Sequence, residues 1–172
     1  MFGFALQYQF GIGRLRTIVL FDTLIEKLTV DEATAVLAHE VGHDKRKHTL
    51  GMLAFTSIQM FVFTFIIGQL LERDDFAAAL GAQSSFHIAA IAFMILLKPL
   101  SLLLSWASNT YSRRNEFEAD QFATSTYKPE VMKSALEKMA AGELVNLSPH
   151  PWYVKVHYSH PPLIERVKAL SS

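Results

Sequence analysis

Two long apolar runs dominate the pattern of hydrophobic and polar positions along this 172-residue chain. The first, from Leu50 to Leu71, contains no charged residue, and the second, from Phe86 to Ala107, is interrupted only by Lys98-Pro99. About 20 apolar residues in a helix cross a hydrocarbon core of roughly 30 Å. Buried helices of a soluble domain are rarely so long and apolar on every face. The pattern therefore predicts two transmembrane helices.

Shorter patterns on the N-terminal side predict two strands and a helix. Residues Ala5 to Phe10 alternate loosely, and Thr17 to Phe21 is apolar and rich in β-branched residues, so two short strands are expected around the Gly11-Ile-Gly13 turn. The first strand either pairs with an extended substrate or belongs to a purely structural hairpin. Apolar residues then recur at helical spacing from Val30 towards Asp44, and the acidic pair Asp31-Glu32 at the start of this segment suits a helix N-terminus.

On the C-terminal side the pattern changes from amphipathic to irregular. Residues Pro129 to Ala141 carry apolar side chains at helical spacing, which predicts an amphipathic helix. The stretch from Asn146 to Ser159, rich in Pro, His and aromatic residues, is expected to be a loop. A short helix, Leu163 to Leu170, is predicted after Pro161-Pro162, because proline is favourable in the first turn of a helix.

The helix that follows Val30 carries the strongest chemical signal, His39-Glu40-Val41-Gly42-His43. Histidines four residues apart project from one face of a helix and can bind one metal ion, while Glu40 lies close enough to act on a water at that metal. This H-E-x-x-H arrangement is typical of zinc peptidases, although it also occurs by chance in proteins that bind no metal.

A third ligand is available in the polar segment Asn115 to Ala123. Glu116 and Asp120 are spaced four apart there, beside an apolar face made of Phe and Ala. We expect Glu116 to be the ligand and Asp120 to be an outer carboxylate that hydrogen-bonds the far nitrogen of a ligating histidine. If the two apolar runs cross a membrane, the chain returns to the side it left, so Glu116 and the histidine motif can meet.

Three motifs in order, HEVGH, SRRNEFEADQFA and HYSHPPLIERVKAL, resemble peptidase family M48, in particular the Ste24-type CaaX prenyl proteases of membranes. The resemblance covers about Arg16 to Leu170. It implies one zinc ion per chain, held by His39, His43 and Glu116, with Glu40 as the general base.

The resemblance also implies two roles for the C-terminal segment. It assigns His160 to the active site, where an imidazole could donate to the oxyanion of the tetrahedral intermediate. Arg166, in the following helix, could reach the site and hold either Asp120 or the terminus of the substrate. Other histidines, such as His48, are interpreted as interfacial or loop residues.

Together these patterns predict a mainly α fold, a zincin-like metallopeptidase core with a short β-hairpin and two transmembrane helices. Three segments are expected: residues 1–48 with the hairpin and zinc-motif helix, 49–107 with the transmembrane hairpin, and 108–172, which completes the zinc site. The basic residues of Lys45-Arg46-Lys47 and Arg113-Arg114 lie on the zinc side of the two apolar runs. The segment that connects the runs, Glu72 to Asp75, has one basic residue, Arg73. The positive-inside rule then places the zinc site of this multi-pass protein on the cytoplasmic face, of a bacterial inner membrane or of endoplasmic reticulum.

Composition narrows the partners. Apolar residues make up 51% of the chain, which is high for a soluble domain and agrees with contact with a lipid bilayer. The formal net charge is zero, so no nucleic-acid partner is expected. The chain has no cysteine, which excludes disulfides, a thiol nucleophile and thiolate zinc ligands.

The function expected from these features is that of a zinc-dependent membrane endopeptidase that cleaves C-terminal CaaX-type prenylated peptides. A membrane quality-control protease of the HtpX type is the alternative within the same class. A di-iron carboxylate oxidase would need a second Glu-x-x-His, which the sequence lacks. A zinc-binding module that is inactive without further transmembrane helices is a third possibility, because Ste24-type enzymes normally carry several such helices before the motif.

Overall fold

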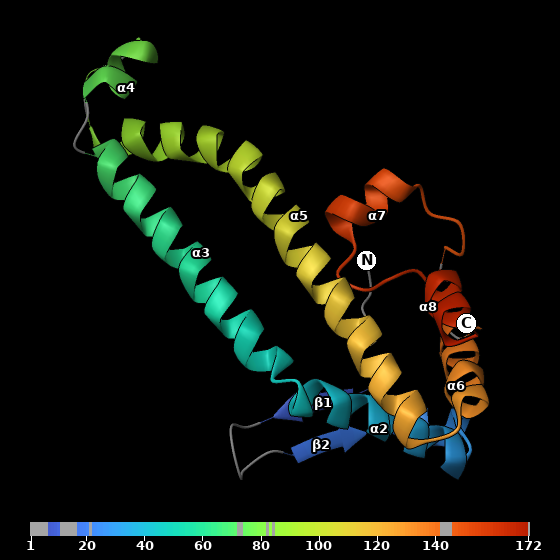
Figure 1. Cartoon of the computed structure of the whole chain (residues 1–172). Coiled ribbons are helices and arrows are strands. Elements are labelled where there is room, and N and C mark those ends of the chain that lie inside the picture. The colour runs from blue at the N-terminus through green and yellow to red at the C-terminus, as the bar shows by residue number, and fades with distance from the viewer. Residues whose placement is uncertain are drawn as a thin grey trace.

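The chain is mainly helical, as the sequence pattern predicted, and α2 (Val30–Lys45), α6 (Pro129–Ala141) and α8 (Leu163–Leu170) lie at one end of a long helical hairpin (Figure 1). The computed structural model describes residues 7–10, 17–20, 22–71, 74–81, 83, 85–141 and 146–171. The elements within these residues are β1 (Gln7–Phe10), β2 (Thr17–Leu20), α1 (Asp22–Lys27), α2 (Val30–Lys45), α3 (His48–Leu71), α4 (Asp74–Ala79), α5 (Phe86–Thr126), α6 (Pro129–Ala141), α7 (Pro151–His157) and α8 (Leu163–Leu170).

The two strands form an antiparallel pair at the N-terminal end of the chain. Gln7 lies opposite Leu20, and Phe10 lies opposite Thr17. The turn predicted at Gly11 to Gly13, like Ala5 and Phe21 at the outer ends of the predicted strands, lies outside the described residues.

Helix α2 begins with a capping box. The hydroxyl of Thr29 accepts a hydrogen bond from the backbone N–H of Glu32, and the Glu32 carboxylate accepts one from the N–H of Thr29 at 2.8 Å. The same carboxylate, although buried, also accepts hydrogen bonds from Ser134 and Lys138 of α6. Glu32 therefore fixes both the start of α2 and its contact with α6.

Helices α3 and α5 form the long hairpin, with α4 at its far end (Figure 1). Among the described residues, His48–Gln69 of α3 is long and apolar enough to cross a membrane. Helix α5 meets the same test only if its two parts count as one span, because Phe86–Ile95 and Leu97–Thr126 are bent by 44°. The bend lies one turn before Pro99, as expected where a proline ring clashes with the carbonyl four residues earlier.

The second apolar run and the polar segment that follows it belong to the same helix. Helix α5 continues without a break through residue 107 as far as Thr126, so that the apolar run and the polar segment with Glu116 form one helix of 41 residues. Glu116 and Asp120 are thus carried on a rigid extension of the second hairpin helix.

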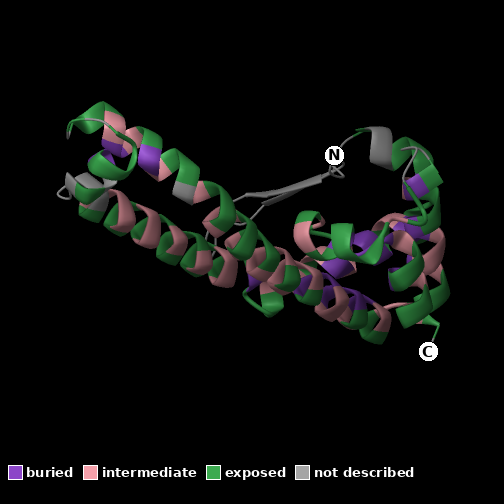
Figure 2. Ribbon diagram, turned by 90° about the horizontal axis from the view of Figure 1, so that it is seen from above, coloured by how far each residue is buried: buried purple, intermediate pink, exposed green. Residues whose placement is uncertain are grey.

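The buried core lies where α2, α6 and α8 pack around the C-terminal part of α5, and Figure 2 shows buried residues gathered at that end, with a smaller group at the far end of the hairpin. Small residues allow α2 and α5 to approach closely. Ala35, Ala119 and Ala123 are at most 1% exposed. A Cβ on Gly42 would lie 3.1 Å from the Cα of Ala119, which is tighter than nearly all real contacts. The distance between the two helices therefore favours glycine at this position of the histidine motif, because the nearest atoms include the backbone of Ala119.

The prediction of a loop from Asn146 to Ser159 is wrong for its central part, because Pro151–His157 forms α7. His150 caps this helix by accepting a hydrogen bond from the N–H of Trp152, and Pro151 occupies the first helical position. Proline and histidine, which suggested a loop, thus serve as the helix start.

Polar side chains of α5 hold α7 in place. Arg113 donates to the backbone oxygens of Val154 at 3.0 Å and Tyr158 at 2.6 Å, and Asn109 donates to the oxygen of Val156 at 2.6 Å. These bonds satisfy carbonyls at the end of α7 and fix the chain just before His160.

Candidate metal centre

Helix α2 and helix α5 bring His39, His43 and Glu116 together. The Nε2 atoms of the two histidines are 3.1 Å apart. Glu116 approaches His43 Nε2 at 3.4 Å through Oε1 and His39 Nε2 at 3.7 Å through Oε2. His39 and Glu116 are 6% and 7% exposed, so the cluster is largely shielded from water.

The donor set and its dimensions fit a zinc ion. Tetrahedral ligands about 2.0 to 2.1 Å from zinc lie roughly 3.3 Å from one another, and the three observed separations are 3.1, 3.4 and 3.7 Å. Two imidazoles and one carboxylate form the protein ligand set of a catalytic zinc site, which keeps one position open. Among the described residues, these three side chains form the group that could hold a metal.

Asp120 and Arg166 lie behind His39 and hold it. Asp120 Oδ1 is 2.9 Å from His39 Nδ1, the ring nitrogen that faces away from the cluster. Arg166 of α8 donates to both oxygens of Asp120, at 2.8 and 2.6 Å, and its third nitrogen lies 3.4 Å from Glu116. Of the two roles expected for Arg166, the structure therefore has the contact with Asp120. The pair fixes the ring of His39 and links α8 to the site.

Burial and charge act in opposite directions on Arg166, which is 8% exposed. Burial alone would lower the pKa of its guanidinium, but the hydrogen bonds and charge of Asp120, together with the charges of Glu116 and Glu40, raise it above its usual range. Arg166 is thus a permanent cation that offsets the negative charge of the carboxylates around it.

Glu40 is half-buried on α2, directly after His39. Its charge contributes to raising the pKa of Arg166, which lies beside Glu116. A carboxylate in this position can accept a proton from a water near the ligand cluster.

His160 lies at the open edge of the cluster. Its Nε2 is 3.8 Å from Glu116 Oε1, and 47% of its side-chain surface is exposed. Desolvation of the ring lowers its pKa, and nearby cationic groups such as Arg166 lower it further, against the opposing effect of Glu116. The hydroxyl of Ser159 is 3.1 Å from His160 Nδ1, so that a proton on Nε2 would leave Nδ1 free to accept from the serine.

His48 and Glu118 were not predicted to belong to the site, but they lie against it. His48, interpreted from the sequence as interfacial, is 5% exposed, and its Nδ1 is 2.9 Å from His43 Nδ1. Its Nε2 is 3.4 Å from Glu118, which also pairs with Arg114 at 2.9 Å. The available signal was the five-residue spacing from His43 to His48, but that spacing places two residues on one side only if the helix ends between them.

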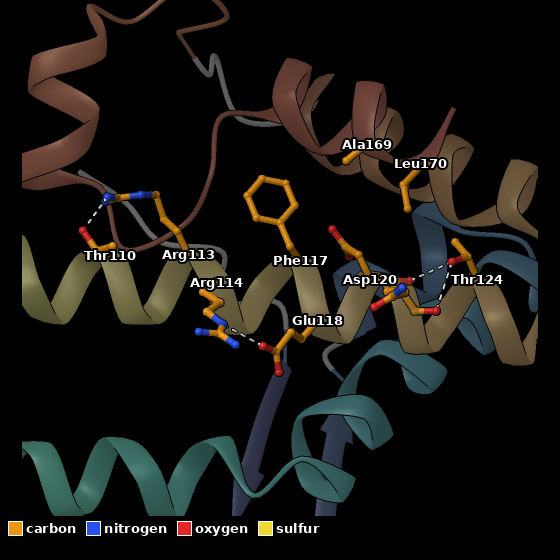
Figure 3. Close-up of a pocket in the computed structure, with 10 residues that line it drawn as sticks. Thr110, Arg113, Arg114, Phe117, Glu118, Asp120, Thr124, Ala169 and Leu170 are labelled. Carbon is orange, nitrogen blue, oxygen red and sulfur yellow. Dashed lines mark hydrogen bonds and ion pairs between the residues drawn. The ribbon is translucent and has the colours of Figure 1, made fainter. Parts of the chain in front are cut away.

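A pocket of about 660 Å³ is lined by residues of α5 and by the end of α8 (Figure 3). Its lining residues are Thr110, Arg113, Arg114, Phe117, Glu118, Asp120, Gln121, Thr124, Ala169 and Leu170. None of His39, Glu40, His43 and Glu116 lines it. The pocket therefore reaches the outer carboxylates Asp120 and Glu118 but not the ligand cluster itself.

Comparisons with known proteins point to one family. The sequence profile described as "Peptidase family M48" matches residues 7–172. The chain is 38% identical to a "CAAX prenyl protease 1 homolog" of Oryza sativa over 168 residues, which is 95% of this chain and 39% of the rice protein. It is 32% identical to "CAAX prenyl protease 1" of Saccharomyces cerevisiae, covering 90% of this chain and 38% of the yeast protein.

The fold has a counterpart among solved structures. The crystal structure of S. mikatae Ste24p matches with a TM-score of 0.81 and 31% identity, covering 95% of this chain and 41% of that one. The chain thus spans about two fifths of the length of the relatives that it matches.

Proposed function

The chain belongs to peptidase family M48, and on that premise we propose that it carries the catalytic zinc centre of a membrane metalloendopeptidase. The observation that supports this most directly is the cluster of His39, His43 and Glu116, whose donor atoms all lie within 4.8 Å of one another. The glutamate that follows the first histidine supplies a general base beside it.

Each residue of the site has a separate role in the proposed peptide hydrolysis. When bound by His39, His43 and Glu116, zinc polarises the scissile carbonyl and makes water a better nucleophile at neutral pH. Glu40 accepts the proton of the attacking water and passes it to the leaving amine. His160 donates through Nε2 to the oxygen on which negative charge develops. Asp120 and Arg166 hold the ring of His39 in place.

The membrane part of the proposal concerns α3 and α5. We expect both to cross the bilayer, α3 as one apolar span and α5 as a span bent before Pro99. Basic residues gather at the metal end of the hairpin, including Lys45 and Arg114, so the zinc site should face the cytoplasm. A membrane-impermeant reagent added on one side should label either Asp75 or Lys45, but not both. Labelling of both residues from the same side would contradict two crossings.

For the substrate we propose a C-terminally prenylated CaaX peptide, because the relatives with 32% and 38% identity are named for that activity. The alternative is a quality-control protease of the HtpX type, which would cleave misfolded membrane proteins without a prenyl group. A farnesylated CaaX peptide and its unprenylated copy separate the two. Preference for the farnesylated peptide supports the first, and equal cleavage supports the second.

The central test changes the base and a ligand separately. Glu40→Gln should retain one zinc per chain and reduce hydrolysis by about 10² to 10⁴-fold, because a base is lost while all three ligands remain. Glu116→Ala should lose both zinc and hydrolysis. Glu130→Gln, an exposed change on α6, is the matched control.

Zinc per chain, measured on purified protein in lipid nanodiscs, is read beside peptide hydrolysis. Loss of zinc in Glu40→Gln would show that this residue is a ligand, which contradicts the proposed role. Full zinc content in Glu116→Ala would remove it from the ligand set. A wild-type protein that binds zinc but cleaves no peptide would indicate a binding module that needs further parts of a longer protein.

A further inference from the structure

The far side of the His43 ring is held by residues that no role described so far requires. His43 Nε2 points towards Glu116, and its other nitrogen, Nδ1, lies 2.9 Å from Nδ1 of His48. His48 in turn places Nε2 3.4 Å from Oε2 of Glu118. Three side chains from α2, α3 and α5 therefore form one continuous row that ends at the metal centre.

Zinc binding by His43 would determine which nitrogen of each ring in this row carries a proton. If His43 binds zinc through Nε2, its one ring proton must reside on Nδ1. The neighbouring Nδ1 of His48 must then be unprotonated to accept that hydrogen bond, which places the proton of His48 on Nε2. That proton points to the carboxylate of Glu118, which can only accept. Each group in the row thus has one compatible role.

Glu118 is itself held in place. Its Oε1 pairs with Arg114 one turn earlier on α5 at 2.9 Å, and its Oε2 lies 3.5 Å from Arg46, the C-cap residue of α2. Figure 3 shows Arg114 and Glu118 paired on α5 and pointing away from α8. The position of the Glu118 carboxylate is thus fixed by the two arginines and does not depend on His48 alone, as is expected of a group that orients a histidine.

The backbone is shaped to bring His48 back to His43. Helix α2 ends at Lys45 and α3 begins at His48. Lys47 between them has a φ of 57°, the left-handed conformation that residues other than glycine rarely adopt. This turn reverses the chain so that the first side chain of α3 lies against the last turn of α2. An unfavourable backbone angle beside a metal cluster is a feature associated with functional sites.

From this geometry we infer that His48 and Glu118 are positioning residues for the metal centre, which hold His43 in the tautomer and orientation that zinc binding requires. The inference rests on the proposed zinc site. The arrangement mirrors Asp120 behind His39, with one difference: the carboxylate acts on His43 through a second imidazole. Each ligating histidine then has an outer partner that ends in a carboxylate.

The test is the zinc dissociation constant of the full chain, measured at pH 7 by competition with a chromophoric chelator. His48→Phe keeps the ring volume but removes the acceptor, and it should weaken zinc binding about 10 to 100-fold. His48→Asn should bind within a few-fold of wild type, because the amide oxygen can replace Nδ1 as the acceptor. His157→Phe on α7, an exposed histidine, is the matched control and should change nothing.

Glu118 is tested in two backgrounds. Glu118→Gln should weaken zinc binding in the wild type but add no further loss to His48→Asn, because asparagine no longer passes the effect of the carboxylate to His43. An equal loss of zinc affinity in both backgrounds would mean that Glu118 acts only through its charge and not through His48. That result would contradict the inferred chain of contacts.

A second readout is the protonation of the ring nitrogens. Nitrogen chemical shifts of ¹⁵N-labelled histidine in the zinc-loaded protein should include a ring with its proton on Nε2 whose signals disappear in His48→Asn. A His48 ring with its proton on Nδ1, or zinc affinity unchanged in His48→Phe, would refute the inference. Failure of the wild type to bind zinc would instead refute the proposed function, so the two outcomes are distinguishable.

Discussion

The buried pair of Asp120 and Arg166 gives the sharpest test of how the metal centre is supported. Asp120 is 2% exposed and Arg166 is 8% exposed, and two hydrogen bonds of 2.8 and 2.6 Å join them. Arg166→Met keeps most of the side-chain volume and removes the cation. It leaves Asp120 and Glu116 as two buried carboxylates without their shared partner.

Breaking a buried ion pair by removing one partner costs about 3 to 5 kcal/mol, because the remaining charge is left uncompensated. For a protein of this size a loss of 1 kcal/mol lowers the midpoint of thermal unfolding by about 2 to 4 °C. Arg166→Met should therefore lower the midpoint of the zinc-free protein by roughly 6 to 20 °C. Zinc brings positive charge to the same carboxylates, so the loss should be smaller in the zinc-loaded protein.

The assay is thermal unfolding in nanodiscs, followed by circular dichroism with and without zinc. The control is Arg114→Met, since Arg114 also pairs with a carboxylate at 2.9 Å but its side chain is 77% exposed. An exposed pair contributes about 0.2 to 1 kcal/mol, so this change should be small. If Arg166→Met is no more destabilising than Arg114→Met in the zinc-free protein, the reasoning from burial fails. Asp120→Asn combined with Arg166→Met should recover part of the loss, because Glu116 is then the one carboxylate of the pair left without the cation.

Two further changes test the packing and the cap of α2. Gly42→Ala should destabilise the protein and weaken zinc binding although alanine is favoured in helices, because its Cβ would press on the backbone of Ala119. The control Gly68→Ala, with nothing within 4 Å of the added Cβ, should be neutral or stabilising. Thermal unfolding measures the stability of both variants, and chelator competition measures their zinc binding. Hydrogen bonds from Lys138, Ser134 and Thr29 lower the pKa of Glu32 from 4.5 to about 2, so its contribution is present above pH 4.5 and is lost as the pH falls towards 2. Glu32→Gln should therefore cost about 1 to 2 kcal/mol at pH 7, after allowance for the exposed Lys138, and the difference should shrink on acidification of the zinc-free protein; a constant difference would show that the charge plays no part.

Local spacing made the first half of the metal centre predictable. His39 and His43 had to share a face once the helix was assigned, because a four-residue spacing is close to one helical turn. Glu116 followed from a less local argument, namely that two long apolar runs return the chain to its starting side. The second run and the polar segment form one continuous helix, and the crossing of a membrane by both runs stays a prediction.

Contacts between distant elements were less accessible. The interpretation of Asn146 to Ser159 as a loop relied on its prolines and histidines, whereas His150 and Pro151 start α7. Local propensity cannot reveal this because α7 is stabilised by hydrogen bonds from Arg113 and Asn109, which are about 40 residues away. Similarly, the role of His48 depends on the backbone angle of one lysine, which no hydrophobic pattern encodes.

The two long helices are coupled to the metal centre in different ways. In α5 the bend between Ile95 and Leu97 lies about 20 residues before Glu116, or roughly 30 Å along a helix. In α3 the first residue, His48, touches His43 directly. The start of α3 is therefore joined directly to the candidate metal centre, whereas the apolar part of α5 is separated from Glu116 by several helical turns.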